Sequence, residues 1–211
     1  MDTLKHEHII KWLEKTSLVL IENKEYLTKL DSDIGDADHG FNMERGFKKV
    51  FDKSEEFKLN TDLGAIFKNV GMTLISSIGG ASGPLYGTFF LQMGMGTISK
   101  TALSLKEFTD GFAMGVEGVK KRGRASVGDK TMIDVLEPVL ESLTDSVATN
   151  TSFETAFINM VEVAEKGMKC TIPLIAKKGR ASYLGERSIG HQDAGATSSY
   201  LILKSLKEAI A

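Results

Sequence analysis

Apolar residues recur at spacings of three and four along most of the chain, and only three prolines interrupt them. This periodicity is typical of helices that bury one face, and the alternation typical of strands is rare. The pattern therefore predicts an all-α protein of eight helices. We expect these helices at about 4–29, 41–53, 63–77, 85–99, 105–123, from 130 onward, from the signature at 151–154 to about 178, and from 193 to the end.

Local signals support several of these boundaries. Ser104 and Glu107 form a capping-box pattern at the start of the fifth helix, and Thr151 and Glu154 form another at the start of the seventh. Pro138 lies inside the sixth helix, where its missing N–H group predicts a kink.

The segments between the helices differ in a regular way. Those that follow the second, fourth and sixth helices are short and polar, whereas those that follow the odd-numbered helices are glycine-rich and carry the unusual residues. In an antiparallel up-and-down arrangement, all four odd-to-even connections lie at one end. The sequence therefore predicts an up-and-down eight-helix barrel or bundle with its functional site at one end.

The first odd-to-even connection is strongly acidic. Four aspartates fall within eight residues and are followed directly by His39; they are Asp31, Asp33, Asp36 and Asp38. Gly35 and Gly40 give the backbone the freedom to form a turn that brings carboxylates together. Because such carboxylates repel one another, a hard divalent cation among them would stabilise the turn.

An EF-hand calcium loop is the obvious alternative, but its register does not fit. A loop that starts at Asp31 would need glycine at Asp36 and glutamate at Asn42, and one that starts at Asp36 would end on Phe47. Magnesium needs only one or two carboxylates together with water and phosphate oxygens, so we interpret the stretch as a Mg²⁺–phosphate site. A solvated acidic turn that caps the next helix is the simpler alternative.

The other three connections carry groups suited to phosphate. The glycine-rich stretch 77–87 lacks the Gly-Lys-Ser/Thr of a Walker A loop, and close helix packing would explain its glycines equally well. The stretches 120–132 and 177–195 place Arg124 and Arg180 beyond the helix stop, and guanidinium groups match phosphate oxygens. Asp193 either caps the last helix or also fixes its loop at a nucleotide.

Length and composition narrow the class of protein. The 211 residues suit one domain, residues 1–211, and the net charge of −2 indicates no bulk attraction to nucleic acid or membranes. Residues 69–99 carry no charge, but glycines and Pro84 interrupt them, so we expect two buried helices rather than a membrane span. One cysteine and a charged N-terminal stretch favour a cytoplasmic protein.

Four long motifs in order resemble the nucleotide-binding L subunits (DhaL) of bacterial, phosphoenolpyruvate-dependent dihydroxyacetone kinases. They are LDSDIGDADHGFNMERGF, SSIGGASGPLYGTFF, GDKTMID and KGRASYLGERSIGHQDAGAT. The resemblance covers essentially the whole chain. It implies an antiparallel eight-helix barrel with ADP and two Mg²⁺ ions at one end.

The resemblance also implies site residues. Asp31, Asp36 and Asp38 would be the metal ligands, and Asp33 is not one of the three ligand positions. The residues implied to contact the nucleotide are His39, Gly40, Phe41, Asn42, Ala81, Ser82, Gly123, Met132, Arg180, Asp193, Ala194 and Gly195. The chain departs from the family pattern at Ala194, where proline is usual. No side-chain nucleophile is implied, so positioning and charge neutralisation would be the contribution of this chain.

The implied activity is that of a phosphotransferase subunit. Tightly bound ADP would be rephosphorylated by a phosphocarrier M subunit of the phosphotransferase system, and the γ-phosphate would pass to dihydroxyacetone held on a histidine of a separate K subunit. The alternatives are a kinase domain for another small-molecule acceptor, an ADP/ATP sensor that binds a transcription regulator, and a two-metal hydrolase. A homodimer is also left open.

Overall fold

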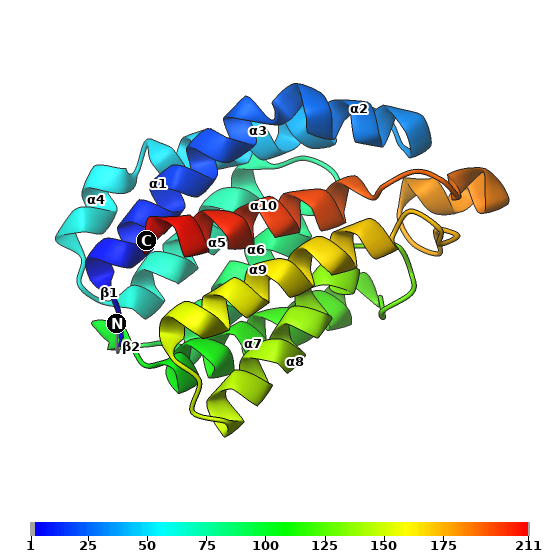
Figure 1. Ribbon diagram of the computed structural model, residues 1–211. Coiled ribbons are helices and arrows are strands. Elements are labelled where there is room, and N and C mark those ends of the chain that lie inside the picture. Colours follow the sequence, from blue (N-terminus) through cyan, green and yellow to red (C-terminus); the bar gives the residue numbers. More distant parts are fainter. Residues whose placement is uncertain (1–2, 211) are drawn as a thin grey trace.

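The computed structural model describes residues 3–210 (Figure 1). Its helices are α1 His6–Glu22, α2 Lys24–Ile34, α3 His39–Phe51, α4 Ser54–Leu59, α5 Leu63–Ser77, α6 Ser82–Gly96, α7 Leu105–Gly123, α8 Ile133–Ala148, α9 Phe153–Cys170, the 3-10 helix η1 Arg180–Ser188, and α10 Ala194–Ala209. Two-residue strands, β1 Leu4–Lys5 and β2 Ala102–Leu103, pair antiparallel. The predicted all-α class is confirmed.

The long helices pack side by side around a shared core. Going around the molecule, α1 packs against α3, α3 against α5, α5 against α6, and α6 against α7. The sequence of contacts continues through α8, α9 and α10, and α10 returns to α1. Figure 1 shows α2, η1 and the loop before α8 gathered at one end of these helices, and β1 with β2 at the other.

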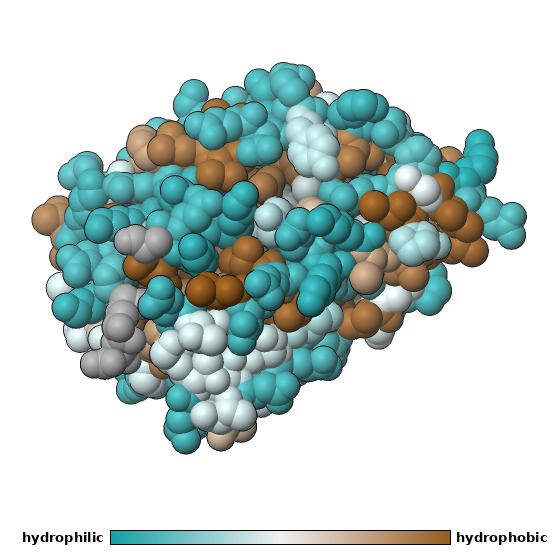
Figure 2. Space-filling view, viewed as in Figure 1, coloured by the Kyte–Doolittle hydropathy of each residue, from teal (hydrophilic) through white to brown (hydrophobic). Residues whose placement is uncertain are grey.

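Hydrophilic residues cover most of the face shown in Figure 2, and aromatic side chains fill the centre of the arrangement beneath it. Trp12, Phe67 and Phe90 come from three different helices and are almost completely buried. Their ring centroids lie 5.9–6.3 Å apart in edge and tilted arrangements, which are the favoured geometries for aromatic pairs. The indole N–H of Trp12 donates a hydrogen bond of 2.9 Å to the carbonyl of Ile202, so α1 and α10 are joined through the core.

The charge-free stretch 69–99 forms α5 and α6, which pack backbone to backbone. A Cβ atom added at Gly71 would lie 2.7 Å from the Gly87 carbonyl oxygen, and one added at Gly94 would lie 2.7 Å from the Gly64 carbonyl oxygen. Only glycine permits this approach. The two buried helices that the sequence predicts are therefore confirmed, and none of the helices within residues 3–210 has the length and hydropathy needed to span a bilayer.

Several predicted boundaries are confirmed. α5 and α7 occupy the expected residues, and α10 begins directly after Asp193. At the start of α7, the Ser104 hydroxyl accepts from the Glu107 N–H while the Glu107 carboxylate accepts from the Ser104 N–H, so the capping box is formed. The second capping pattern is shifted by one residue, because Ser152 rather than Thr151 caps α9.

Other boundaries are wrong. The helix expected at 4–29 is interrupted at Asn23 and resumes as α2, which continues to Ile34 and so contains Asp31 in its last turn. The helix expected to reach 178 ends at Cys170, because Pro173 lacks an N–H group and disfavours helical geometry in the residue before it. The sequence interpretation also missed α4, η1 and the strand pair.

Candidate functional site

The four glycine-rich connections, which follow the odd-numbered helices predicted from the sequence, converge on one cavity of about 930 Å³. In the structure they lie before α3, α6, α8 and α10. The connection between α2 and α3 contributes Asp36, that between α5 and α6 contributes Ala81, that before α8 contributes Met132, and that before α10 contributes Arg180. The convergence that the alternation of the loops predicts is therefore observed.

The acidic cluster lies at one side of this cavity. Each of Asp31, Asp36 and Asp38 has a carboxylate oxygen within 4.8 Å of an oxygen of the other two. Asp33, which was excluded from the ligand set, instead lies 3.6 Å from the Lys29 ammonium and 3.7 Å from His191 Nδ1. Carboxylate oxygens are the hard ligands that Mg²⁺ binds in proteins, so this cluster can supply the one or two carboxylates that each ion needs.

Local backbone geometry creates the cluster. The Asp31 Oδ2 atom accepts hydrogen bonds of 2.8 and 3.2 Å from the backbone N–H groups of Asp38 and His39, which closes the turn onto the end of α2. Gly35 lies inside this turn, where an added Cβ would be only 2.0 Å from Asp31 Oδ1. The glycine is therefore required by the position of the Asp31 carboxylate.

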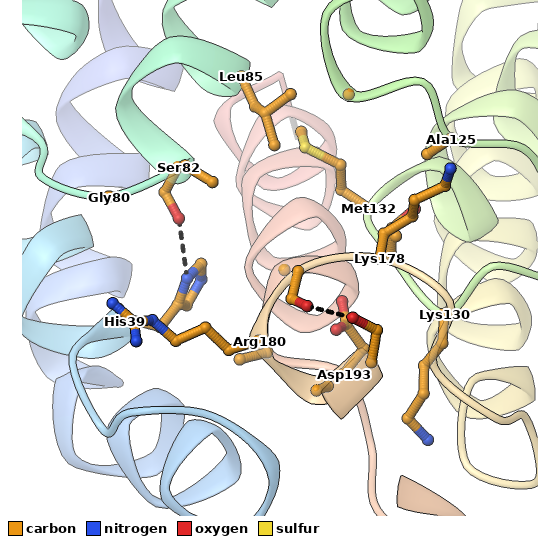
Figure 3. Close-up of a pocket in the computed structure, with 18 of the residues that line it drawn as sticks. His39, Gly80, Ser82, Leu85, Ala125, Lys130, Met132, Lys178, Arg180 and Asp193 are labelled. Carbon is orange, nitrogen blue, oxygen red and sulfur yellow. Dashed lines mark hydrogen bonds between the residues drawn. The ribbon is translucent and has the colours of Figure 1, made fainter. Parts of the chain in front are cut away.

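Arg180 reaches the acidic cluster from the opposite side of the cavity. Its Nε atom lies 2.7 Å from Asp36 Oδ2, and its side chain is largely exposed. Figure 3 shows Arg180 extending from η1 toward the region of His39. Gly179 precedes it with a φ of 62°, a conformation that glycine adopts without strain. The guanidinium group of Arg180 thus lies beside the acidic cluster, where it can contact an anion bound there.

His39 is buried at the first turn of α3 and connects two walls of the cavity. Its Nε2 atom lies 2.8 Å from Ser198 Oγ, and its Nδ1 atom lies 3.2 Å from Ser82 Oγ (Figure 3). The Tyr86 hydroxyl continues this network, since it lies 2.6 Å from Ser198 Oγ. Burial lowers the pKa of His39, so the imidazole is neutral near pH 7 and orients Ser82 without adding charge.

The start of α6 forms another part of the wall. Gly80 has a φ of 64°, and α6 begins at Ser82, so the first-turn N–H groups that lack helical partners lie at the edge of the cavity. Such groups favour anions. The glycines of this loop therefore allow the turn that leads into α6, whereas the glycines within α5 and α6 allow the two helices to pack closely.

The cavity also has an apolar wall. Leu85, Val119, Ala125, Met132 and Ile133 line it. Figure 3 shows Leu85, Met132 and Ala125 on one side of the cavity and His39 and Arg180 on the other. The cavity can therefore receive a molecule with a flat apolar part and an anionic part.

Asp193 caps α10, as expected. Its Oδ2 atom accepts a 2.7 Å hydrogen bond from the Ala196 N–H, and its own N–H donates to Thr171 Oγ1 at 3.0 Å. Burial raises the pKa of Asp193 to about 7, and the negative charge of Asp134 contributes to the rise. Ala194 and Gly195, at the start of α10, line the cavity together with Asp193. Ser82, at the start of α6, and Gly123, at the end of α7, line it as well.

Three predicted nucleotide contacts do not line the cavity. An added Cβ at Gly40 would meet the Lys24 carbonyl of α2 at 2.0 Å, so this glycine allows α3 to pack closely. Phe41 is half exposed, with the Lys24 ammonium 5.2 Å from its ring centroid. Asn42 is buried, and its side-chain oxygen accepts a 2.6 Å hydrogen bond from Arg45. Their contact with a nucleotide stays a prediction.

The sequence interpretation also misjudged some cations. Arg124, expected to face the site, is exposed and does not line the cavity. Arg122, Lys130, Lys177 and Lys178 do line it, although nothing in their spacing distinguished them from other surface cations.

Comparisons with known proteins identify the family. The family model described as the DAK2 domain matches residues 33–208. The chain is 49% identical over 97% of its length to the "PEP-dependent dihydroxyacetone kinase, ADP-binding subunit DhaL" of Escherichia coli K12, of which it covers 97%. It is 44% identical over 96% of its length to the "PTS-dependent dihydroxyacetone kinase, ADP-binding subunit DhaL" of Lactococcus lactis, of which it covers 96%.

Solved structures agree on the fold. The native dihydroxyacetone kinase of C. freundii matches with a TM-score of 0.71 at 26% identity, over 95% of this chain and 34% of that kinase. The same enzyme in complex with AMP-PNP and Mg²⁺ also gives a TM-score of 0.71, over 94% of this chain and 33% of that one, and at 24% identity it shows the fold alone. The chain belongs to the DAK2 domain family, among the ADP-binding DhaL subunits of dihydroxyacetone kinases.

Proposed function

We propose that this chain is the ADP-binding subunit of a phosphoenolpyruvate-dependent dihydroxyacetone kinase and that its cavity is the nucleotide site. One observation carries the proposal. Three carboxylates lie within 4.8 Å of one another in a cavity that also has an apolar wall, formed by Leu85, Val119, Ala125, Met132 and Ile133. A purine base suits the apolar side, and a magnesium-bound diphosphate suits the acidic side. The names of the full-length relatives agree with this assignment.

Charge supports the presence of cations in the cluster. Asp31, Asp36 and Asp38 carry three negative charges in a small space, and Arg180 is paired with only one of them. Carboxylates at this spacing are stabilised by divalent ions. Two Mg²⁺ ions held there would neutralise and orient phosphate oxygens, which is the chemistry that such ions supply in phosphoryl transfer.

The residues of this chain then bind and orient. Ser82 and the opening turn of α6 offer donors to phosphate oxygens, and Arg180 offers a guanidinium beside Asp36. Leu85 and Met132 cover the base. Catalysis by this chain consists of positioning and electrostatic stabilisation, since the transferred group needs no covalent partner on it.

The wider assembly follows from the same proposal. ADP that stays tightly bound to this chain is rephosphorylated by a phosphocarrier M subunit of the phosphotransferase system, and the γ-phosphate passes to dihydroxyacetone on a separate K subunit. In the same proposal, residues 1–211 form one domain in the cytoplasm, and the eight helices of the circuit, α1, α3 and α5 to α10, form an antiparallel barrel with the nucleotide at one end.

A matched pair of variants tests the metal assignment. Asp36→Asn removes one carboxylate charge from the cluster, whereas Asp33→Asn removes one from a neighbouring position outside it. We expect Asp36→Asn to weaken Mg²⁺-dependent ADP binding roughly 100-fold and Asp33→Asn to leave it nearly unchanged, as measured by calorimetry. Equal ADP affinity in both variants, with unchanged circular dichroism, would count against the site.

Reconstitution tests the reaction. The chain should support phosphoryl transfer to dihydroxyacetone only when K and M subunits are both present. A sensor would bind ADP without supporting transfer, and a two-metal hydrolase would cleave a phosphoester with no partner protein.

A further inference from the structure

Lys130 occupies an unusual position in the loop between α7 and α8. Its φ is 62°, in the left-handed region that non-glycine residues rarely adopt. Its side chain is among the largest that are fully buried, with a residue exposure of 1%. Figure 3 shows this side chain directed away from Met132 and Leu85. Lys130 therefore borders the cavity, but its ammonium group points away from the apolar wall.

The ammonium group is held by backbone carbonyl oxygens. Lys130 Nζ donates hydrogen bonds of 2.5 Å to the His191 carbonyl, 2.7 Å to that of Thr171, and 3.2 Å to that of Leu174. The Ile172 carbonyl oxygen lies 3.4 Å away. This set of neutral oxygens resembles the surroundings of a bound monovalent cation. We call these four oxygens the carbonyl cage.

The carbonyl cage belongs to the segment that carries the cationic side of the cavity. Thr171, Ile172 and Leu174 lie directly after α9, and His191 lies shortly before α10. Between them runs the stretch that contains η1 and Arg180. The Gly190 N–H donates to the Ile172 carbonyl at 2.8 Å, so the two ends of the stretch already meet. Lys130 fastens both ends to the loop that precedes α8.

Thr171 also connects Lys130 to Asp193. Thr171 provides a carbonyl to Lys130 and a side-chain oxygen to the Asp193 N–H. Burial lowers the pKa of Lys130, while the carboxylates of Asp193 and Asp134 raise it. Burying an ammonium group is costly unless its hydrogen bonds are satisfied, and here the carbonyl cage satisfies them.

We propose that Lys130 is a positioning residue for the cavity. Its ammonium, held in the carbonyl cage, fixes the segment from Thr171 to His191 and sets where Arg180 and Asp193 lie relative to Met132. At position 130, the guanidinium group of an arginine would be too large and planar for the carbonyl cage. A methionine there would leave the carbonyl oxygens of the cage without a hydrogen-bond donor. The effect on ADP binding rests on the proposed function, whereas the effect on the segment does not.

The test removes the ammonium and then supplies it from solution. Lys130→Ala deletes four side-chain atoms, and n-propylammonium has the same three carbons and one nitrogen. Lys106→Ala is the control, because Lys106 is exposed on α7 and pairs with Asp110 away from the cavity. Amide hydrogen exchange of the ADP-free proteins reports the segment 171–193, and calorimetry reports ADP affinity.

We expect Lys130→Ala to speed exchange across 171–193 at least tenfold, to leave the exchange of α1 and α5 unchanged, and to weaken ADP binding roughly tenfold. Added n-propylammonium should restore protection of the segment, whereas tetramethylammonium at equal ionic strength should not, since it has no N–H donor and its methyl groups keep the charge away from the oxygens. Lys106→Ala should behave as the wild type. If Lys130→Ala does not fold, Lys130→Gln takes its place in the exchange measurement, with the same expected loss of protection.

Wild-type protection of 171–193 in the variant would overturn the proposal, as would a loss that n-propylammonium does not reverse better than tetramethylammonium. Failure of the wild type to bind ADP would instead overturn the proposed function, and the exchange result for Lys130 would stand on its own.

Discussion

The role of the turn in shaping the acidic cluster can be tested by adding a methyl group at Gly35, where the turn has no room for a side chain. In Gly35→Ala, the added methyl group would lie 2.0 Å from Asp31 Oδ1, and ordinary contacts begin at 3.4 Å, so the carboxylate must move by about 1.4 Å. That movement exceeds what the octahedral geometry of Mg²⁺ tolerates at a ligand distance of about 2.1 Å. It also breaks the hydrogen bonds that Asp31 accepts from the N–H groups of Asp38 and His39.

The magnitude follows from these losses. Removing a side chain that caps a helix start costs about 1–2 kcal/mol of the free energy of unfolding. Displacing one of three metal ligands should weaken Mg²⁺-dependent ADP binding by roughly 100-fold, as removal of a carboxylate would. Chemical denaturation measures the first quantity, and calorimetry with ADP at fixed Mg²⁺ measures the second.

A double-mutant cycle separates this explanation from general damage. In an Asp31→Ala background the carboxylate is gone, so Gly35→Ala should cost clearly less stability and almost no further ADP affinity. Part of the stability loss should remain, because the new methyl group still lies 2.9 Å from the Asp31 carbonyl oxygen. Equal losses in the two backgrounds would refute the argument, since the two sites would then act independently.

Two further substitutions probe α7 and the buried network. Hydrogen bonds from Lys100 and Ser104 lower the pKa of Glu107 to about 2, so its stabilisation is present above pH 4.5 and is lost as the pH falls toward 2. Glu107→Gln should therefore cost about 0.5 kcal/mol at pH 7, after solvent screening, and nothing near pH 2, as measured by urea unfolding; a pH-independent difference would contradict this. Tyr86→Phe should cost about 1 kcal/mol, because the Gly195 carbonyl still accepts from Ser199 Oγ at 2.9 Å; a loss above about 3 kcal/mol in the same assay would show an unsatisfied buried group.

Much of the fold was predictable because local signals and the helical period agree. The capping box at Ser104 needs only neighbouring residues, and so it was correct. The aspartate cluster was predictable for the same reason, since its three carboxylates lie within eight residues and two glycines allow the turn. The convergence of four distant loops followed from the alternation of loop types.

Some features were missed because they depend on contacts between distant residues, and one because a local stop signal was overlooked. Lys130 looks like any loop lysine, because only the fold brings the carbonyls of Thr171 and His191 around it. The end of α9 was misplaced because helical periodicity continues past Cys170, while Pro173 and the turn after Thr171 stop the helix.

The cavity is bordered by residues as far apart in the chain as Asp31 and Gly195. No short fragment can therefore assemble it, and unfolding anywhere around the circuit of helices disperses its walls. Occupancy and global unfolding are for this reason thermodynamically linked: a ligand at 100 times its dissociation constant adds about 2.7 kcal/mol to the free energy of unfolding. A rise in melting temperature with ligand concentration consequently reports on the entire molecule.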